Sequence, residues 1–269
     1  MYTTLYLVRH GQTVFNTRGL IQGRSDSPLT DLGREQAWAA ARWLRERGVS
    51  CAEAFSSPME RACATTELLW AGSYMRLTGL SERSFGELEG TEVRQLPRPL
   101  GDYPAGFGGE SLCALEERLV RTMVRVMTGA YRDGEVPAGR TAAAAIEGCP
   151  AVAGHAGAAA AEGLCADGAR WGIERPAAVR RAPVPGRSDA PIDPGALEPG
   201  PRGTGEVLAV SHGAACKAFA HAWEAHAQVA VPDPLPNCMV MVFAFDGRRF
   251  SLREVADPAG YLGGEGLSI

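Results

Sequence analysis

Short apolar runs alternate with longer amphipathic segments along this chain, and that alternation restricts the possible folds more than any other feature. The run LYLVR at residues 5–9 is typical of a buried strand. Residues 30–47 then predict a helix, because alanines and a leucine recur at i, i+3, i+4 and i+7 from Ala37. Thr30 is expected to cap this helix at its start, and Gly48 is expected to end it.

The same alternation continues to the end of the sequence. A strand in AEAFSSP is followed by a helix to about Trp70, for which Ser57 is the expected N-cap and Glu60 the partner in a capping box. Further segments predict a helix at 111–131, a strand in GEVLAVSHG, a helix in AACKAFAHAWEAHA and a hairpin around Asp246-Gly247. The predicted fold is α/β, with three layers: a mostly parallel sheet, helices on both faces and an antiparallel edge hairpin.

Residues 134–205 differ from the rest, because they are rich in Ala, Gly and Pro and poor in large apolar side chains. Such a composition buries little surface and orders poorly. We therefore interpret the chain as one domain over residues 1–269 that carries a poorly ordered insertion. The insertion follows a helix, so it is anchored away from the edge of the sheet where ligands bind.

Composition and charge exclude several classes of function. The net charge of −4 and pI of about 5.8 argue against a nucleic-acid partner. No apolar run is long enough to span a membrane, and no signal peptide is visible. The seven cysteines are odd in number and form no C-x-x-C pair, which favours reduced thiols over disulfides or a zinc site. We expect a cytoplasmic protein.

Basic residues follow the predicted strands at one edge of the sheet. Arg9 and His10 come directly after the first strand, and Arg61 lies in the first turn of a helix that follows a strand. His212 and Gly213 end another strand and open a helix. In an open α/β sheet such positions are neighbours in space. Arginines and helix N-termini both suit phosphate oxygens, so the sequence predicts a phosphoryl site.

A histidine in such a site has a chemical role beyond binding. Neutral imidazole is a nucleophile near pH 7, and attack on phosphorus gives a phosphohistidine. No cluster with metal-ligand spacing is visible, so we expect no metal, with the arginines stabilising the transferred group instead. The leaving alkoxide needs a general acid, and the glycine-broken stretch GLSERSFGELEG offers Glu82, Glu87 and Glu89. Spacing alone leaves these three open.

Five motifs in this order resemble the histidine phosphatase superfamily, which includes the cofactor-dependent phosphoglycerate mutases. They are LVRHGQTVFN, SSPMERACATTELL, LSERSFGELEG, GGESL and VSHGAA. The resemblance covers about residues 1–131 and 206–257 and leaves out the insertion. It implies a phosphoglycerate mutase-like fold.

The resemblance also implies a role for each motif residue. His10 would be the phosphorylated nucleophile, with Arg9, Arg61 and His212 around the phosphate and Glu82 as the proton donor. Near the substrate the resemblance implies Asn16, Gln22 and Gly213.

The same resemblance leaves two reactions, since a phosphohistidine can transfer its group to water or to another hydroxyl. The wording G-Q-T and I-Q-G-R-S-D-S-P-L-T is more similar to the phosphatase branch, and residues 90–109 lack a basic, Pro-rich closing segment. We expect a phosphomonoesterase of the histidine acid phosphatase type that acts on a small phosphorylated metabolite without a cofactor. The alternative is a mutase that needs 2,3-bisphosphoglycerate. A phosphoprotein phosphatase or pseudoenzyme that uses the insertion, and a homodimer through the hairpin, also stay open.

Overall fold

The computed structural model describes residues 1–130, 196–197 and 205–260. In chain order its elements are β1 Thr4–Arg9, α1 Val14–Thr17, α2 Asp31–Glu46, β2 Glu53–Ser56, α3 Glu60–Leu69, β3 Tyr74–Arg76, α4 Leu112–Thr128, β4 Glu206–Ser211, α7 Gly213–Ala222, β5 Val240–Phe245 and β6 Phe250–Ala256. Short 3₁₀ helices lie at Thr78–Leu80, Gly86–Leu88, Val93–Gln95, Tyr103–Phe107 and Glu224–His226. Among these described helices, none is long and apolar enough to cross a membrane.

The described strands form one sheet in the order β3-β2-β4-β1-β5-β6. The first four are parallel to one another, whereas β5 is antiparallel to both β1 and β6. The chain turns between β5 and β6 at Asp246 and Gly247, and Gly247 has a φ of +99° that favours glycine. The predicted mostly parallel sheet with an antiparallel edge hairpin is confirmed.

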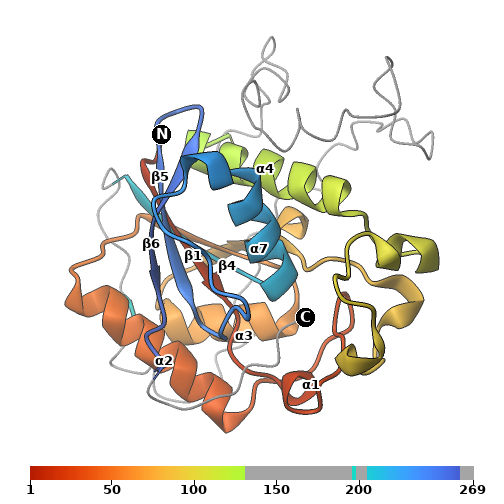
Figure 1. Ribbon diagram of the computed structural model, residues 1–269. Coiled ribbons are helices and arrows are strands. Elements are labelled where there is room, and N and C mark those ends of the chain that lie inside the picture. Colours follow the sequence, from red (N-terminus) through yellow and green to blue (C-terminus); the bar gives the residue numbers. More distant parts are fainter. Residues whose placement is uncertain (131–195, 198–204, 261–269) are drawn as a thin grey trace, which may run out of the picture.

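Helices cover both faces of this sheet (Figure 1). Leu5 and Leu7 of β1 pack in the apolar cluster under α4 and α7, whereas Tyr6 and Val8 pack in the cluster under α2 and α3. This alternation is the two-residue period of a strand that is buried on both faces. The three-layer architecture that the sequence predicted is therefore present.

Two of the predicted helices have the expected starts. The Thr30 hydroxyl accepts the N–H of Gly33 at the start of α2, and the Ser111 hydroxyl accepts the N–H of Ala114 at the start of α4. The helix after β2 differs from the prediction. It begins at Glu60 with Met59 as a cap that makes no side-chain bond, so the predicted Ser57–Glu60 capping box was wrong.

The helix predicted in AACKAFAHAWEAHA is also shorter than expected. It ends at Ala222, and a 3₁₀ turn over Glu224–His226 replaces the last part. Trp223 leaves the helical conformation there, and its buried indole packs on Phe250 with ring centroids 5.4 Å apart. Tertiary burial of one aromatic side chain thus decided where this helix stops.

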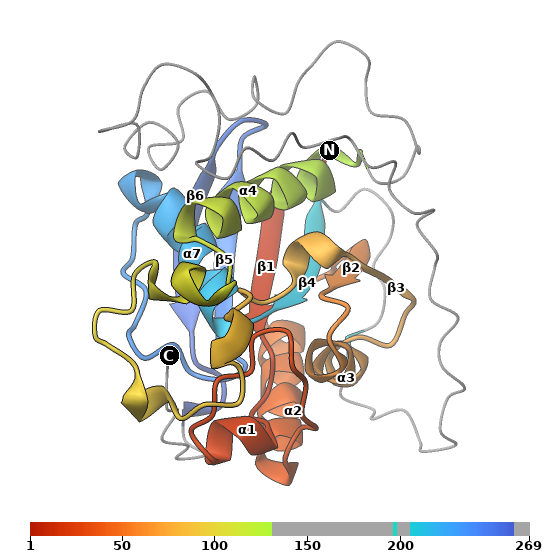
Figure 2. The same ribbon diagram turned by 90° about the vertical axis from the view of Figure 1, so that its right-hand side faces the viewer.

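The two central strands, β1 and β4, are parallel neighbours that continue into helices on opposite faces (Figure 2). β1 leads through a loop to α2, and β4 leads directly to α7. Between such strands the chain diverges to both sides of the sheet, which leaves a crevice at their carboxyl ends. The topology places any ligand site there.

Most of the predicted insertion at 134–205 lies outside the described residues, so the expectation that it is poorly ordered stays a prediction. Of this segment the structure describes Ala196, Leu197 and Gly205. Leu197 is buried and pairs with Trp70 beside α3 through a bridge between their backbones. Within the described ranges, Cys51, Cys63, Cys216 and Cys238 are buried free thiols.

Candidate active site

β1 and β4 bring the R-H-G and S-H-G motifs together. Arg9 pairs with Ser211 in the parallel register, and the N–H of His10 donates to the carbonyl of Ser211 at 3.0 Å. The imidazole rings of His10 and His212 lie edge to face, with centroids 5.2 Å apart. Residues more than 200 positions apart in the sequence thus share one buried site.

A cleft opens at this end of the sheet. Every residue that the sequence predicted for the site lines it, except His212. Lys217 and Leu235 line it as well, although sequence reasoning did not single them out. The fold therefore brings the predicted residues together. His212 does not line the cleft itself, but its ring contacts that of His10.

His10 has the tautomer that a nucleophile requires. Its Nδ1 lies 2.7 Å from the carbonyl oxygen of Gly11, which only accepts hydrogen bonds, so Nδ1 carries the proton and Nε2 keeps its lone pair. Burial lowers the pKa of His10 well below 6.5, and the charges of Arg61 and Arg9 lower it further. The imidazole is thus neutral at pH 7 and available to attack an electrophile.

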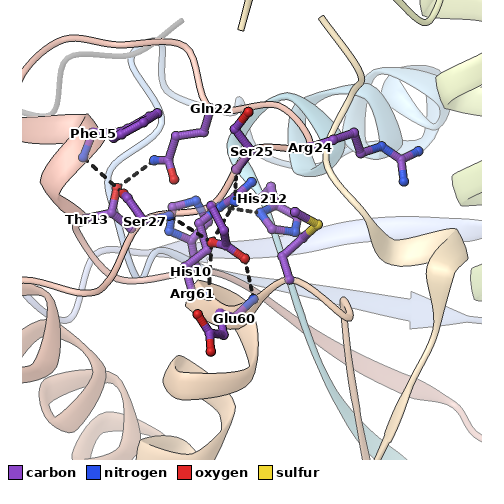
Figure 3. A network of polar contacts seen from close by, with 12 residues as sticks. His10, Thr13, Phe15, Gln22, Arg24, Ser25, Ser27, Glu60, Arg61 and His212 are labelled. Atoms are coloured by element: carbon purple, nitrogen blue, oxygen red, sulfur yellow. Dashed lines mark hydrogen bonds and ion pairs between the residues drawn. The ribbon is translucent and has the colours of Figure 1, made fainter. Parts of the chain in front are cut away.

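Arg61 is held in the second position of α3 by contacts to one loop. Its Nη1 donates to the carbonyl of Ser25 at 2.8 Å and pairs with Asp26 at 2.9 Å, and its Nη2 donates to the carbonyl of Gly23 at 2.8 Å. Figure 3 shows this guanidinium group between the loop and His212. The arginine is fully buried, so this network fixes a positive charge beside His10.

Asp26 also closes the start of α3. Its carboxylate accepts the backbone N–H of Glu60 at 2.5 Å and that of Arg61 at 3.4 Å. An acidic group at the first turn satisfies free N–H donors and complements the helix dipole. This loop carboxylate, 35 residues away from Arg61, takes the place of the predicted capping box.

His212 is engaged through both ring nitrogens. Its Nδ1 accepts from Nε of Arg61 at 3.2 Å, so Nε2 carries the proton and donates to the Ser57 hydroxyl at 2.7 Å. Burial and the neighbouring Arg61 lower the pKa of His212 well below 6.5. In this arrangement His212 orients Arg61, and its direct contact with a phosphate stays a prediction. Ser57 is a site residue that the sequence reasoning had assigned only to a helix cap.

The guanidinium group of Arg9 has one nitrogen that is hydrogen-bonded to the protein and one buried nitrogen that is not. The carbonyl of Leu235 accepts from its Nη1, whereas its Nε, also buried, has no hydrogen-bond partner among the described residues. A Cβ at position 213 would lie 3.3 Å from that Nε, so Gly213 lets α7 begin directly against the guanidinium group. A buried N–H without a partner is costly, and an anion in the cleft would satisfy it.

Of the three candidate acids, Glu82 is the one that lines the cleft. Its carboxylate accepts the N–H groups of Arg83, Ala214 and Ala215 at 2.8 to 3.1 Å, which fixes it against the first turn of α7. Glu89 instead accepts from the backbone of Arg24 and Ser25 and braces that loop.

The third candidate, Glu87, is exposed. Position thus favours Glu82 among the three carboxylates that spacing left open.

Asn16 and Gln22 also line the cleft. The Asn16 side chain accepts from Thr13 at the start of α1, and Gln22 donates to the Thr13 hydroxyl at 2.6 Å. The Oε1 atom of Gln22 is buried without a partner in the described part of the chain. Asn237, which the sequence analysis missed, donates to the carbonyl of His10 at 3.0 Å and to Asn16 at 3.4 Å. It fixes the position of both residues.

The lining of the cleft is therefore mainly cationic, with Arg9, Arg61 and Lys217 against the single carboxylate of Glu82. In the described ranges, no three or more His, Cys, Asp and Glu side chains form a group that could hold a metal ion. The arrangement suits an anion that enters next to Nε2 of His10.

The two buried histidines make stability depend on pH. Their pKa values are lowered in the folded protein but lie near 6.5 in the unfolded chain, so below pH 6.5 the unfolded chain binds more protons. The free energy of unfolding should be level above that pH and fall below it, by up to about 1.4 kcal/mol per pH unit for each histidine. Urea unfolding from about pH 8 to about pH 5.5 measures this, and His10→Asn should flatten the slope. Equal slopes for both proteins would contradict the assignment.

Asp26 offers a test of the loop network. Asp26→Asn removes the charge that pairs with Arg61 and weakens the cap of α3, so we expect about 2 kcal/mol lower stability together with a higher KM for anionic substrates. The matched control is Asp31→Asn, which removes an exposed acidic group from the first turn of α2 and should change stability by less than about 1 kcal/mol. Urea unfolding and steady-state kinetics measure both, and equal effects of the two substitutions would contradict this role of Asp26.

This chain is similar in sequence and in fold to known phosphatases and phosphoglycerate mutases. The family model described as histidine phosphatase superfamily (branch 1) matches residues 5–136. A broad-specificity phosphatase of Saccharomyces cerevisiae is 33% identical over 117 residues, which are 40% of this chain and 51% of that protein. A 2,3-bisphosphoglycerate-dependent phosphoglycerate mutase of Methylorubrum populi is 38% identical over 151 residues, which are 50% of this chain and 71% of the mutase. The chain thus spans about half the length of the yeast relative.

The fold is similar to that of a solved phosphoserine phosphatase from Entamoeba histolytica. The TM-score is 0.55 at 16% sequence identity, and the match covers 95% of this chain and 98% of that one. At such low identity the likeness concerns the fold alone.

Proposed function

The chain belongs to the histidine phosphatase superfamily, and from this premise we propose that it is a phosphomonoesterase that works through a phosphohistidine at His10. The observation that carries the proposal is the neutral, buried His10, whose free Nε2 belongs to a residue that lines a cationic cleft. The substrate class is a small phosphate ester. The reaction needs no metal, because the arginines supply the charge that stabilises the transferred group.

Binding of the phosphate is assigned to Arg9, Arg61 and the start of α7. The Nε of Arg9, buried and without a partner, donates to one phosphate oxygen, and the N–H of Gly213 in the first turn of α7 donates to another. Arg61 and His212 keep their mutual hydrogen bond and hold the local charge in place. These groups orient the ester in line with Nε2 of His10.

The first chemical step moves the phosphoryl group to the enzyme. The lone pair of Nε2 forms the N–P bond while the bond from phosphorus to the ester oxygen breaks. Glu82, in its protonated form, gives its proton to the leaving oxygen, so the alcohol departs neutral.

The second step reverses the roles of these groups. A water molecule gives a proton to the Glu82 carboxylate and attacks phosphorus, and the N–P bond breaks to restore neutral His10 and release phosphate. Each turnover therefore returns both side chains to their starting states.

Transfer to water rather than to a second hydroxyl is favoured by the outer part of the cleft. Residues 90–109, which the structure describes in full, contribute none of its lining. Arg94 in this segment is exposed and pairs with Glu92 at 2.7 Å. A basic segment that closes over a second phosphate is thus not formed here, although the similarity to mutases keeps that reaction as the second candidate.

Two assays of the full chain test the proposal. Phosphate release from p-nitrophenyl phosphate and from glycerol 3-phosphate, measured in excess EDTA, reports hydrolysis. Interconversion of 3- and 2-phosphoglycerate with added 2,3-bisphosphoglycerate reports mutase activity.

We expect metal-free hydrolysis with negligible interconversion. Rapid interconversion with weak hydrolysis would assign the chain to the mutases. If EDTA abolishes hydrolysis and a divalent metal restores it, the metal-free mechanism is wrong.

A further inference from the structure

The GGESL motif at residues 108–112 has no role in the mechanism above. Its serine, Ser111, caps α4. Its glutamate, Glu110, makes a two-point ion pair with Arg118 of α4, in which Oε1 accepts from Nε at 2.8 Å and Oε2 accepts from Nη2 at 2.7 Å. The side chains of Arg118 and Glu110 are 21% and 15% exposed. A pair of this geometry fixes the plane of the guanidinium group, so Arg118 is held in one orientation.

The remaining donors of Arg118 reach the loop that carries Glu82. Its Nη1 donates to the carbonyl of Gly79 at 2.9 Å and to that of Ser81 at 3.1 Å. Its Nη2 donates to the carbonyl of Glu82 itself at 3.4 Å. One guanidinium group therefore ties the backbone of this loop, as far as the proposed acid, to α4.

The same loop is packed tightly from two sides. A Cβ at position 79 would collide with the side chain of Thr122, which lies one turn after Arg118, so a glycine there lets the loop lie directly on α4. From the other side, the Ser211 hydroxyl at the end of β4 donates to the carbonyl of Leu80 at 2.8 Å. The backbone that precedes Glu82 is thus clamped between α4 and the sheet.

Glu82 is held at both ends, but only one of the two holds is independent of its proton. Its carboxyl group accepts three backbone N–H groups, those of Arg83, Ala214 and Ala215. These bonds are strongest to the carboxylate and weaken when one oxygen carries the proton that an acid has to deliver. The bonds from Arg118 go to backbone carbonyls, which do not titrate. They can hold Glu82 in the same place in both protonation states.

We propose that Arg118, locked by Glu110, is a positioning residue that keeps Glu82 within reach of the leaving oxygen. This inference rests on the proposed function, since it takes Glu82 as the group that protonates the departing alcohol. It also gives the GGESL motif a part in the reaction. Arg118 and Glu110 are not among the residues that line the cleft, so binding of the phosphate should not depend on them.

The test measures the first step of the reaction in the full chain. Single-turnover rapid quenching gives the rate constant for phosphorylation of His10 by glycerol 3-phosphate, whose alcohol needs a proton to leave, and by p-nitrophenyl phosphate, whose phenolate does not. In Arg118→Gln we expect a loss of about 10- to 100-fold with glycerol 3-phosphate, because the acid is misplaced. With p-nitrophenyl phosphate the loss should stay below about threefold. The substrate concentration that gives half the maximal rate should not change for either ester.

The matched control is Arg121→Gln on the same helix. The Arg121 side chain is 42% exposed, pairs with Glu117 at 2.8 Å and does not line the cleft. Neither rate constant should change by more than about twofold. Glu110→Gln frees Arg118 without removing it, so it should show the same dependence on the leaving group with a smaller loss.

Arg118→Lys tests the geometry of the anchor. Lysine keeps the positive charge but lacks the planar fork that reaches Glu110 and the loop carbonyls together, so it should restore only part of the wild-type rate with glycerol 3-phosphate. Thermal unfolding identifies any variant that does not fold. If Arg118→Gln is such a variant, Arg118→Lys and Glu110→Gln decide by the same comparison of the two esters.

A double variant separates positioning from general support of the fold. Once Glu82→Gln has removed the acid, adding Arg118→Gln should lower the rate constant with glycerol 3-phosphate by less than about twofold, because the two residues act as one unit. A full additional loss in the double variant would overturn the role of Arg118. Equal losses for the two esters in Arg118→Gln, or no loss for either, would overturn it as well.

Failure of this inference is distinguishable from failure of the proposed function. If the wild type forms a phosphoenzyme from both esters and Arg118→Gln does not discriminate between them, only the positioning role is wrong. If the wild type forms no phosphoenzyme, the proposed function fails and the positioning role fails with it.

Discussion

Replacement of His10 by alanine is expected to lower kcat for phosphate release by about 10⁴-fold or more. The reason is that Nε2 of His10 forms the bond to phosphorus in the proposed mechanism, and no neighbouring group in the described part of the chain can take its place. His212 is the imidazole that contacts His10, but its Nδ1 is bonded to Arg61 and its Nε2 donates to Ser57. Phosphate release from p-nitrophenyl phosphate measures the effect.

The control for this substitution is His221→Ala on the same helix as Lys217. The His221 side chain is 58% exposed and contacts Glu116 at 2.8 Å, and it does not line the cleft. Its removal should leave kcat within about twofold of the wild type. Rapid quenching with radiolabelled substrate should also trap a phosphorylated protein that is stable in base and labile in acid, and His10→Ala should trap none. Hydrolysis that survives in His10→Ala would refute the covalent mechanism.

Glu82→Gln is expected to give the second large effect, with kcat lowered by about 10²- to 10⁴-fold for an alkyl phosphate. The loss should be much smaller for p-nitrophenyl phosphate, because p-nitrophenolate leaves without a proton. If Glu82 had a purely structural role, the substitution would lower kcat for both substrates alike. The ratio of the two losses in kcat is therefore the measurement that identifies a general acid.

The geometry of Glu82 makes a second variant necessary. Its two carboxylate oxygens accept three backbone N–H groups, and a glutamine amide offers only one oxygen there. Thermal unfolding should therefore accompany the kinetics, and Glu82→Asp keeps the charge as a comparison. Glu87→Gln, at an exposed position in the same stretch, should change neither rate. Equal losses for both substrates in Glu82→Gln would contradict the role as acid.

Much of the fold was predictable, because the signals that define it are local. Short continuous apolar runs identified β1 and β4, and helical spacing with a threonine cap identified α2. β3 was missed because it has three half-buried residues and carries little pattern. The end of α7 was wrong because packing of Trp223 on Phe250 overrides a sequence that favours a longer helix.

The site, like the fold, has a part that could be predicted from the sequence and a part that could not. The R-H-G and S-H-G motifs could be placed from sequence, since each directly follows a strand and parallel strands end at a common edge. The residues that hold these motif side chains in place could not be predicted from the sequence. Asp26 acts on Arg61 across 35 positions, Ser57 on His212 across 155, and Asn237 on His10 across 227.

By itself, the sequence determined the α/β architecture and which motif residues come together at the end of the sheet, because apolar runs, helical periods and short motifs are written in neighbouring residues. Only the tertiary structure decided which nitrogen of His10 is free, which of three glutamates reaches the cleft, what holds Arg61, and that Lys217 lines the cleft. Those features depend on hydrogen bonds and burial between segments far apart in the chain. The order of residues does not show which distant side chains meet, because that depends on how the sheet brings the segments together.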